Sequence, residues 1–467
     1  MDFRDHSVIE LAADVNAGRR TAESLVQAAL DNISAHNGVI NAFCALDPER
    51  ALEAARAVDA SVRSGTVLPL AGIPFGVKDL EDAEGYVTSY GSAFHTGDAP
   101  ASDDSVLVAR LKAAGAVVVG KTNTPEFGYK GKTDNVPFGP SKNPWDLTRS
   151  PGGSSGGSGA AIAAGMVPMA TGSDGGGSIR IPAAVCGLAG FKSSQGRVPN
   201  GGPKPTGSGL LTVKGPMTYR IKDTIAALDC CLGDEKSDIF ALPAPFDAWL
   251  DRASGRLPER VIWSPTMGIT TVDEDVLRVC NAAIAKLRDA GVEVIEMDQI
   301  WDTHPFPSWV VFWTAARARA QGHLRGTPEW EKIDAALRPQ IEMGLDQFGA
   351  ADYAVAIDQC HLLNVQLEAA FKSAPLILTP TTRGHVPTIE GEGRVDGEET
   401  ADWVAFTMGI NMTRNPAGTL PIGLAADGMP LGLQIIGRQR DDFGVLDAML
   451  GMERVFDFNE RASFPND

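Results

Sequence analysis

The sequence is poor in histidine and cysteine and has no long apolar run. Seven histidines occur among 467 residues, and none of them lies between residues 96 and 303. The six cysteines show no C-x-x-C spacing, so we expect core residues and no metal site. No stretch of 18 apolar residues occurs, and the first seven residues include neither a basic nor an apolar segment. These absences predict a cytoplasmic protein without a signal peptide or a membrane span.

Basic residues are also in deficit. The 41 lysines and arginines face 59 aspartates and glutamates, which gives a net charge of −18. A negative protein repels polyanions, so this balance disfavours nucleic acid and anionic membranes as partners. The composition is typical of a large soluble enzyme.

The most informative segment is the glycine-rich stretch 152–183, which contains two glycine-flanked serines, Ser154 and Ser178. Glycine has no Cβ, so consecutive glycine amides can point at one atom and stabilise the oxyanion formed when a serine attacks a carbonyl. Gly/Ser-rich runs are also typical of flexible linkers. Here the run leads into a good helix former, residues 160–164, in mid-chain. We therefore predict a folded site with Ser178 as the nucleophile.

A serine nucleophile needs a base, and Lys78 is the candidate in a region without histidine. A lysine has an ordinary pKa of about 10.4, so work near pH 7 requires a decrease of roughly 3 units, which burial can supply. Lys78 follows the apolar run 73–77, and Ser178 follows the run 167–171. Both runs predict short buried strands. We expect both residues just past the carboxyl ends of strands, where open α/β sheets bind ligands.

A rival interpretation also fits part of the segment. Residues 152–156, GGSSG, match the G-x-S-x-G elbow of the α/β-hydrolases, with Ser154 as the nucleophile. This alternative needs a downstream acid and histidine, and it leaves Lys78 and the glycines before Ser178 unexplained. The candidate histidines are His304, His323, His361 and His385.

Helical and strand-like segments alternate along much of the chain, which predicts an α/β architecture. Residues 5–62 indicate helices, with apolar spacing of 3.6 residues over 51–58. Further units are a helix capped by Asp103–Asp104 and ending at Ala114, a strand over 116–119, and a strand, helix and strand over 260–264, 274–290 and 292–296.

Residues 300–372 are helix-like and rich in aromatics. Phe306, Trp309, Phe312 and Trp313 recur at spacings of three and four. An aromatic stripe at this spacing usually packs in the core. We interpret the region as a helical wall of the substrate pocket, in which case Trp309 and Trp313 would favour an apolar or aromatic substrate.

The motifs together resemble the amidase signature family, serine hydrolases with a Lys, cis-Ser, Ser triad. GGSSGG followed by GSDGGGSIRIPA resembles the family signature. The flanking motifs occur in the family's order at residues 69–80, 120–128, 143–150, 215–217, 411–416 and 428–437. The resemblance covers residues 5–457 and departs at Gly175, where many relatives have a side chain, and at Ile181, where amidotransferase subunits often have glutamine.

The resemblance implies one domain, residues 1–467, with a large mixed sheet flanked by helices on both faces. Its parts would be an N-terminal helical layer (1–65), a catalytic core (66–235) and the pocket region (300–372). Lys78 would be the base and Ser154 the proton relay after a cis peptide bond. The amides of Gly175, Gly176, Gly177 and Ser178 would form the oxyanion hole, and Gly128 and Tyr129 would line the pocket.

The implied activity is hydrolysis of a small, apolar or aromatic amide, anilide or carbamate through an acyl-enzyme on Ser178, with water as the second substrate and no cofactor or metal. A homodimer is compatible with this activity. The alternatives are acyl transfer by the same intermediate, a glutamine-amidotransferase subunit that supplies ammonia to a partner, and a binding protein on an inactive scaffold.

Overall fold

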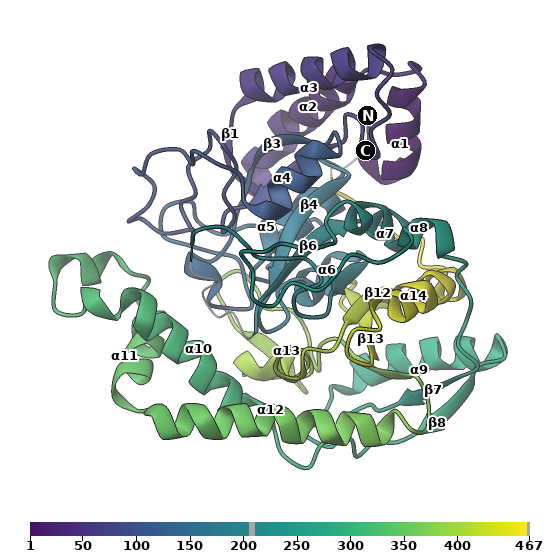
Figure 1. The fold of residues 1–467 in the computed structure, drawn as a ribbon. Coiled ribbons are helices and arrows are strands. Elements are labelled where there is room, and N and C mark those ends of the chain that lie inside the picture. Colours follow the sequence, from purple (N-terminus) through teal and green to yellow (C-terminus); the bar gives the residue numbers. More distant parts are fainter. Residues whose placement is uncertain (205–210, 465–467) are drawn as a thin grey trace.

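The computed structural model describes residues 1–204 and 211–464 (Figure 1). Its N-terminal layer comprises α1 (Val8–Asn16), α2 (Ala22–Ile40) and α3 (Pro48–Arg63). The side chains of Ser7, Thr21 and Asp47 cap these helices by accepting from backbone amides. The prediction of helices alone over residues 5–62 is wrong at β1 (Phe43–Leu46), a strand that pairs antiparallel with β3 (Val117–Thr122). Four residues are too few to show a period, and only pairing with a distant strand selects the extended form.

A five-stranded sheet with the order β1-β3-β2-β4-β6 brings the two predicted strand ends together. The central strand β2 (Pro74–Lys78) is buried along its whole length and runs parallel to both β3 and β4 (Met169–Asp174). Parallel neighbours end at the same edge of a sheet, so Lys78 and the segment after Asp174 lie at one edge. The edge strand beside β4 is β6 (Val213–Thr218), which runs antiparallel to it.

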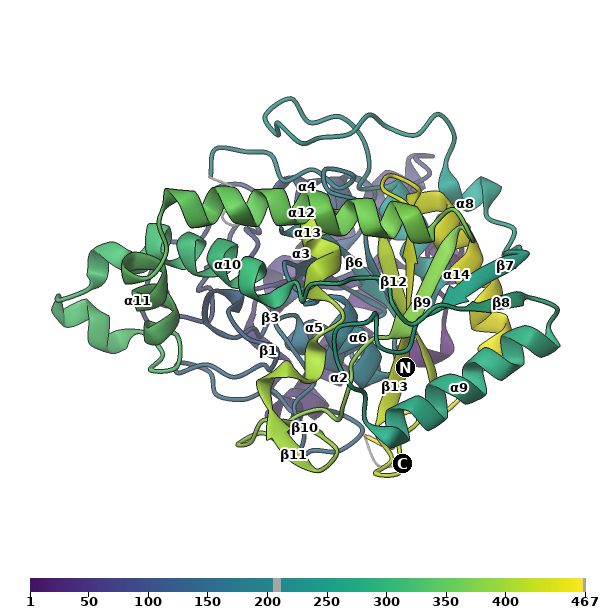
Figure 2. The same cartoon turned by 90° about the horizontal axis from the view of Figure 1, so that it is seen from below.

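A second sheet of six strands has the order β5-β12-β13-β9-β7-β8, antiparallel in its first four strands and parallel from β9 to β8. The strands are β5 (Gly190–Lys192), β7 (Arg260–Trp263), β8 (Glu293–Glu296), β9 (Leu376–Pro380), β12 (Ala417–Leu424) and β13 (Pro430–Gly437). A bridge between Ala189 and Thr218 joins the two sheets at β5 and β6. The predicted class, a large mixed sheet flanked by helices, is confirmed (Figure 2).

The helix capped by Ser105, α4 (Val106–Ala113), starts later than predicted, because Ser105 and not Asp103 or Asp104 accepts from the Val108 amide. The side chain of Asp104 instead accepts from the Glu84 amide and pairs with Lys112. The predicted strand–helix–strand unit is confirmed as β7, α9 (Glu274–Asp289) and β8.

Three helices form a long arm beside the second sheet (Figures 1 and 2). They are α10 (Phe306–Gln321), α11 (Arg338–Asp346) and α12 (Ala350–Ala370), so the helical interpretation of 300–372 is confirmed. The remaining α-helices and strands are α5 (Gly156–Ala163), α6 (Arg180–Cys186), α7 (Ile221–Asp229), α8 (Trp249–Arg252), α13 (Met408–Thr413), α14 (Asp442–Phe456) and the hairpin β10 (Gly393–Val395) and β11 (Glu398–Thr400). Within the described ranges, no helix combines the length and apolar character that crossing a membrane requires.

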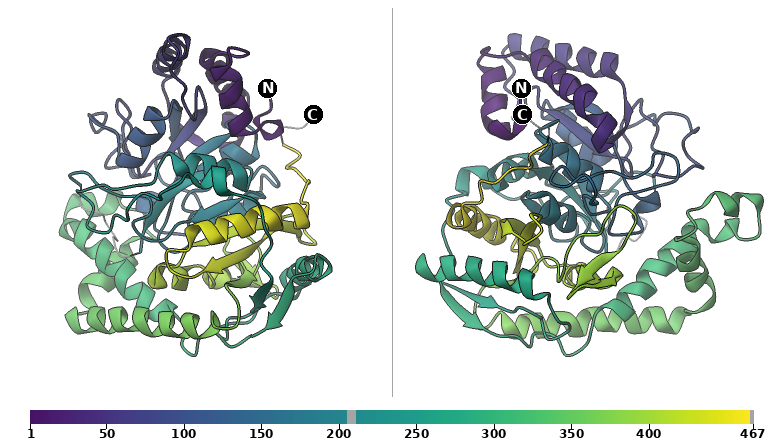
Figure 3. Two further views of the ribbon diagram at one scale, coloured as in Figure 1. Left: turned by 45° about the vertical axis from the view of Figure 1, so that its right-hand side comes forward. Right: turned by 180° about the vertical axis from the view of Figure 1, so that it is seen from behind.

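The first and last described segments lie side by side (Figure 3). The guanidinium of Arg4 donates to the carbonyl oxygen of Ala462 at 2.8 Å, and Arg461 pairs with Asp5. Nearby, Glu453 on α14 accepts from the Ile221 amide at the start of α7 at 2.9 Å. Burial raises the pKa of Glu453 from 4.5 to about 7, and the neighbouring carboxylate of Asp223 adds to the increase.

We expect Glu453→Gln to stabilise the protein above pH 7. A glutamate whose pKa is raised in the native state binds its proton more tightly there, so wild-type stability falls as pH rises from about 4.5 to about 7. Glutamine keeps the acceptor for the Ile221 amide without the charge. Thermal unfolding at pH 8 should show a midpoint roughly 1–3 °C above wild type, and no difference at pH 4. The exposed Glu460→Gln is the control; an equal shift at both pH values would contradict the prediction.

Candidate active site

Lys78 ends the buried strand β2 and contacts three serine hydroxyls. Its Nζ lies 2.7 Å from Ser154 Oγ, 2.8 Å from Ser155 Oγ and 3.0 Å from Ser173 Oγ, and its side chain is fully buried. A neutral amine has two N–H donors and one lone pair, which matches three hydroxyl partners. Burial lowers the pKa of Lys78 to about 7, although the carboxylates of Glu81 and Asp174 oppose the decrease.

Ser154 lies two residues before the start of α5, with a cis peptide bond between Gly153 and Ser154, as the resemblance implies. Gly128 lies against the Ser154 side chain. A Cβ at Gly128 would lie 3.1 Å from Ser154 Oγ and 2.9 Å from Leu80 Cδ1, and the φ of Gly128 is +70°, which disfavours other residues. Only glycine therefore fits beside the Ser154 hydroxyl.

Tyr129 turns away from this cluster. Its hydroxyl donates to Asp334 Oδ2 at 3.0 Å, and its ring packs in a small apolar cluster with Ile333, Leu337 and Ile341. Burial and the Asp334 carboxylate raise the pKa of Tyr129 far above its usual range. The tyrosine thus fastens the loop after Gly128 to the segment before α11.

The loop after β4 presents Ser178. In the run 171–180 only Gly176 and Ser178 are partly exposed, and the Ser155 amide donates to the carbonyl oxygen of Ser178 at 3.3 Å. One of the four predicted oxyanion donors is already engaged, because the Gly177 amide donates to Asp174 Oδ1 at 2.8 Å. Within the described ranges, the amides of Gly175, Gly176 and Ser178 have no acceptor.

Two side chains hold the carbonyl groups of this loop. The indole Nε1 of Trp309 donates to the carbonyl oxygen of Gly175 at 3.0 Å, and Thr407 Oγ1 donates to that of Gly176 at 2.5 Å. Because a trans peptide is planar, its N–H points opposite to its C=O. Trp309 thereby directs the Gly176 amide away from α10, and Thr407 directs the Gly177 amide toward Asp174. Sequence reasoning missed Thr407, which lies in no recognised motif.

The aromatic stripe of α10 covers the two glycines. The rings of Trp309 and Trp313 stack at 4.7 Å, and Trp313 is also part of the main apolar core. A Cβ at Gly175 would lie 3.1 Å from the Trp313 ring and one at Gly176 would lie 2.8 Å from the Trp309 ring. Trp313, together with Thr212, thus fills the space that a side chain at position 175 would need.

A buried ion pair holds the base of the loop. Asp174 and Arg180 are both fully buried, and the guanidinium donates from Nε to Oδ2 and from Nη2 to Oδ1, each at 2.9 Å. Although burial alone raises the pKa of Asp174, Arg180 holds it well below the usual range. Arg180 also donates to Gln434 Oε1 at 2.6 Å and to Asn411 Oδ1 at 2.7 Å. The two closing motifs of the sequence thus meet the signature segment here.

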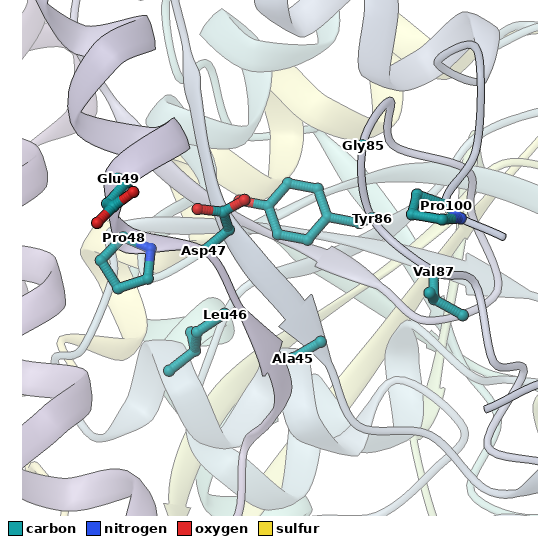
Figure 4. Close-up of a pocket in the computed structure, with 9 residues that line it drawn as sticks. All are labelled: Ala45, Leu46, Asp47, Pro48, Glu49, Gly85, Tyr86, Val87 and Pro100. Atoms are coloured by element: carbon teal, nitrogen blue, oxygen red, sulfur yellow. The ribbon is translucent and has the colours of Figure 1, made fainter. Parts of the chain in front are cut away.

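The histidines required by the elbow interpretation lie elsewhere. His385 lies within 3.5 Å of Asp273 and Asp427, and His304 accepts from the Phe306 amide. Neither Ser154 nor Ser178 hydrogen-bonds a histidine in the part of the chain that the structure describes. A surface pocket beside β1, lined by residues 45–49, 85–87 and Pro100, contains none of the predicted site residues (Figure 4).

Relatives and solved structures of this fold are amidases that act on carbon–nitrogen bonds other than peptide bonds, which makes this chain an enzyme of the amide hydrolase class. The family model "Amidase" matches residues 24–446, so the chain belongs to the amidase signature family.

Relatives and solved structures agree with this membership. The chain is 34% identical to an acylamidase of Rhodococcus erythropolis, over 96% of this chain and 95% of that one. It is also 34% identical to a glutamyl-tRNA(Gln) amidotransferase subunit of Chloroflexus aggregans, over 95% of each chain. Its fold is similar to that of a bacterial aryl acylamidase, with a TM-score of 0.90 and 26% identity over 96% of both chains.

We expect Arg180→Met to be strongly destabilising, because it leaves the Asp174 carboxylate buried without its cation. Losses of this kind are about 3–5 kcal/mol in the free energy of unfolding. Urea unfolding followed by tryptophan fluorescence measures the change. Arg56→Met, which removes an exposed pair with Glu23, is the control and should cost less than about 1 kcal/mol. Equal losses in both variants would show that the buried pair has no special structural role.

Proposed function

We propose that this chain hydrolyses a small, apolar or aromatic amide, anilide or carbamate through an acyl-enzyme on Ser178. The observation that carries the proposal is the buried Lys78, whose Nζ lies 2.7 Å from Ser154 Oγ and whose pKa is lowered to about 7. A lysine in this state is neutral in half or more of the molecules at physiological pH, so it can accept a proton.

In the proposed mechanism Ser154 relays protons between Ser178 and Lys78. Ser178 Oγ attacks the substrate carbonyl while its proton passes to Ser154, whose own proton passes to the Lys78 amine. The proton then returns through Ser154 to the leaving nitrogen, the C–N bond breaks, and an amine departs. Water repeats the sequence on the acyl ester, which releases the acid and restores Ser178.

The oxyanion would be stabilised by the amides of Gly175, Gly176 and Ser178. These three donors remain after Gly177 is committed to Asp174. The contacts of Trp309 and Thr407 with the adjacent carbonyl groups support this role, because they orient the loop before substrate binds. Donors oriented in advance need no reorganisation when the charge develops, which is the main advantage of such a site.

An aromatic substrate is supported by the paired tryptophans beside the loop and by the relatives named acylamidase and aryl acylamidase. A second candidate is transamidation, in which ammonia released from glutamine passes to a partner. The amidotransferase relatives favour it, whereas the apolar Ile181 in place of the glutamine frequent in those subunits argues against it. Glutamine-dependent activity and copurification with a second chain would identify this function.

We expect the purified chain to release amine from a panel of primary amides, anilides and aryl carbamates, and Ser178→Ala to abolish release. Loss of the nucleophile should decrease kcat by at least about 10³-fold, because the acyl-enzyme cannot form. Colorimetric or mass-spectrometric detection of the amine measures it. Single replacements of His304, His323, His361 and His385 are the matched controls and should retain turnover. If replacing one histidine abolished acylation while Lys78→Ala remained active, the elbow mechanism would be established instead.

We expect kcat/KM to rise with pH through an apparent pKa near 7, because only the neutral amine of Lys78 accepts a proton. The profile should rise about tenfold per pH unit below 7 and level off above pH 8. Lys78→Arg keeps a cation at the site and should remove most of the activity at every pH. A profile that is flat from pH 5.5 to 8.5 would show that Lys78 is not the base.

A further inference from the structure

One face of α10 continues beyond the candidate site with polar atoms that lack partners. Trp309, Trp313, Arg317 and Gln321 recur every four residues and so share one helix face. The indole N–H of Trp309 donates a hydrogen bond to the carbonyl oxygen of Gly175. Trp313 Nε1, Arg317 Nε and Gln321 Oε1 are all buried without a hydrogen-bond partner within the described ranges.

Arg317 is a cation without a counter-ion. Its guanidinium carbon lies 4.4 Å from the Trp313 ring, and no carboxylate among the described residues lies within 4.0 Å of its nitrogens. The segment 205–210, outside the described residues, contains no acidic residue that could pair with it. Burial lowers the pKa of Arg317 to about 10, so the group is still charged at neutral pH.

Unpartnered buried donors are costly, so native proteins meet nearly all of them with a protein group, a water, an ion or a ligand. The indole N–H of Trp313 and the guanidinium of Arg317 are donors only, so their partner must supply acceptors, and the uncompensated charge favours an anion. The chain has 59 acidic residues, yet none of the described ones meets this arginine. A bound anionic ligand would supply the missing negative charge.

We infer that Arg317, with the indole N–H of Trp313, binds a carboxylate of the substrate, so that the preferred amide is an aromatic amide carrying an acid group. This inference rests on the proposed function and specifies its substrate class. Arg317 lies one helical turn, about 6 Å, beyond Trp313, which itself covers Gly175. A ring placed beside the stacked tryptophans would therefore separate the carboxylate from the carbonyl that Ser178 attacks.

The test compares ligands that differ only in charge. One pair, 4-acetamidobenzoate and 4-acetamidobenzyl alcohol, carries the difference on the amine half. The other, succinanilate and 4-hydroxybutyranilide, carries it on the acyl half. Tryptophan fluorescence measures Kd on Ser178→Ala, and amine release measures kcat/KM on the wild type. In at least one pair we expect the anion to bind about 10- to 100-fold more tightly, with a matching preference in kcat/KM.

Arg317→Gln should abolish this preference, and Arg317→Lys should retain part of it, since a lysine keeps the charge without the planar fork. Arg319→Gln removes the same charge from another face of α10 and is the control. If Arg317→Gln does not fold, the test rests on the wild type. Its preference for the anionic member of a pair should then decrease between about 50 and about 500 mM salt, and the lack of any preference would overturn the carboxylate site.

Two sets of outcomes are distinguishable. Turnover of both members of each pair without a preference, or a preference that Arg317→Gln retains or Arg319→Gln also removes, would overturn the carboxylate site and leave the hydrolase in place. Binding of the anion that depends on Arg317, in a wild type that releases no amine, would support the site and overturn the proposed function.

Discussion

The buried ion pair between Asp174 and Arg180 is the constraint on which the catalytic loop depends. Its carboxylate accepts from the Gly177 amide, and its guanidinium reaches Asn411 on α13 and Gln434 on β13. One charged pair thereby connects the end of β4, the start of α6 and the second sheet. The pair is fully desolvated, so removing either partner would leave an uncompensated charge in the core. The loop that presents Ser178 is therefore anchored to both sheets.

Local sequence signals accounted for the elements that end in the site. The apolar run before Lys78 is short and bounded by loops, and it forms β2; the run before the signature glycines forms β4. The glycine-rich segment also led to Ser154, which lies against Lys78 as expected. In each case the residues that specify the structure are neighbours in the chain, so the sequence alone predicts the element.

Contacts between segments that are distant in the chain could not be predicted in this way. Strand β1 exists because β3 lies beside it, and the Gly177 amide is lost to Asp174 because of how the loop closes. Thr407 hydrogen-bonds Gly176, which lies more than 200 residues earlier in the chain. The lack of a partner for Arg317 Nε depends on which acceptors the fold places near it. No spacing rule in a single sequence reports such contacts, because they arise only when the two sheets and the helical arm are assembled.

The burial of Lys78 also has an effect on the whole molecule. An exposed lysine in an unfolded chain binds a proton with a pKa of 10.5, whereas in the folded protein the pKa is about 7. Folding between these two pH values therefore releases that proton to the solvent, and the folded state becomes more stable as pH rises from about 7 to about 10.5. The group that would make the enzyme reactive is thus one that weakens its fold, a trade-off between stability and activity located in a single side chain.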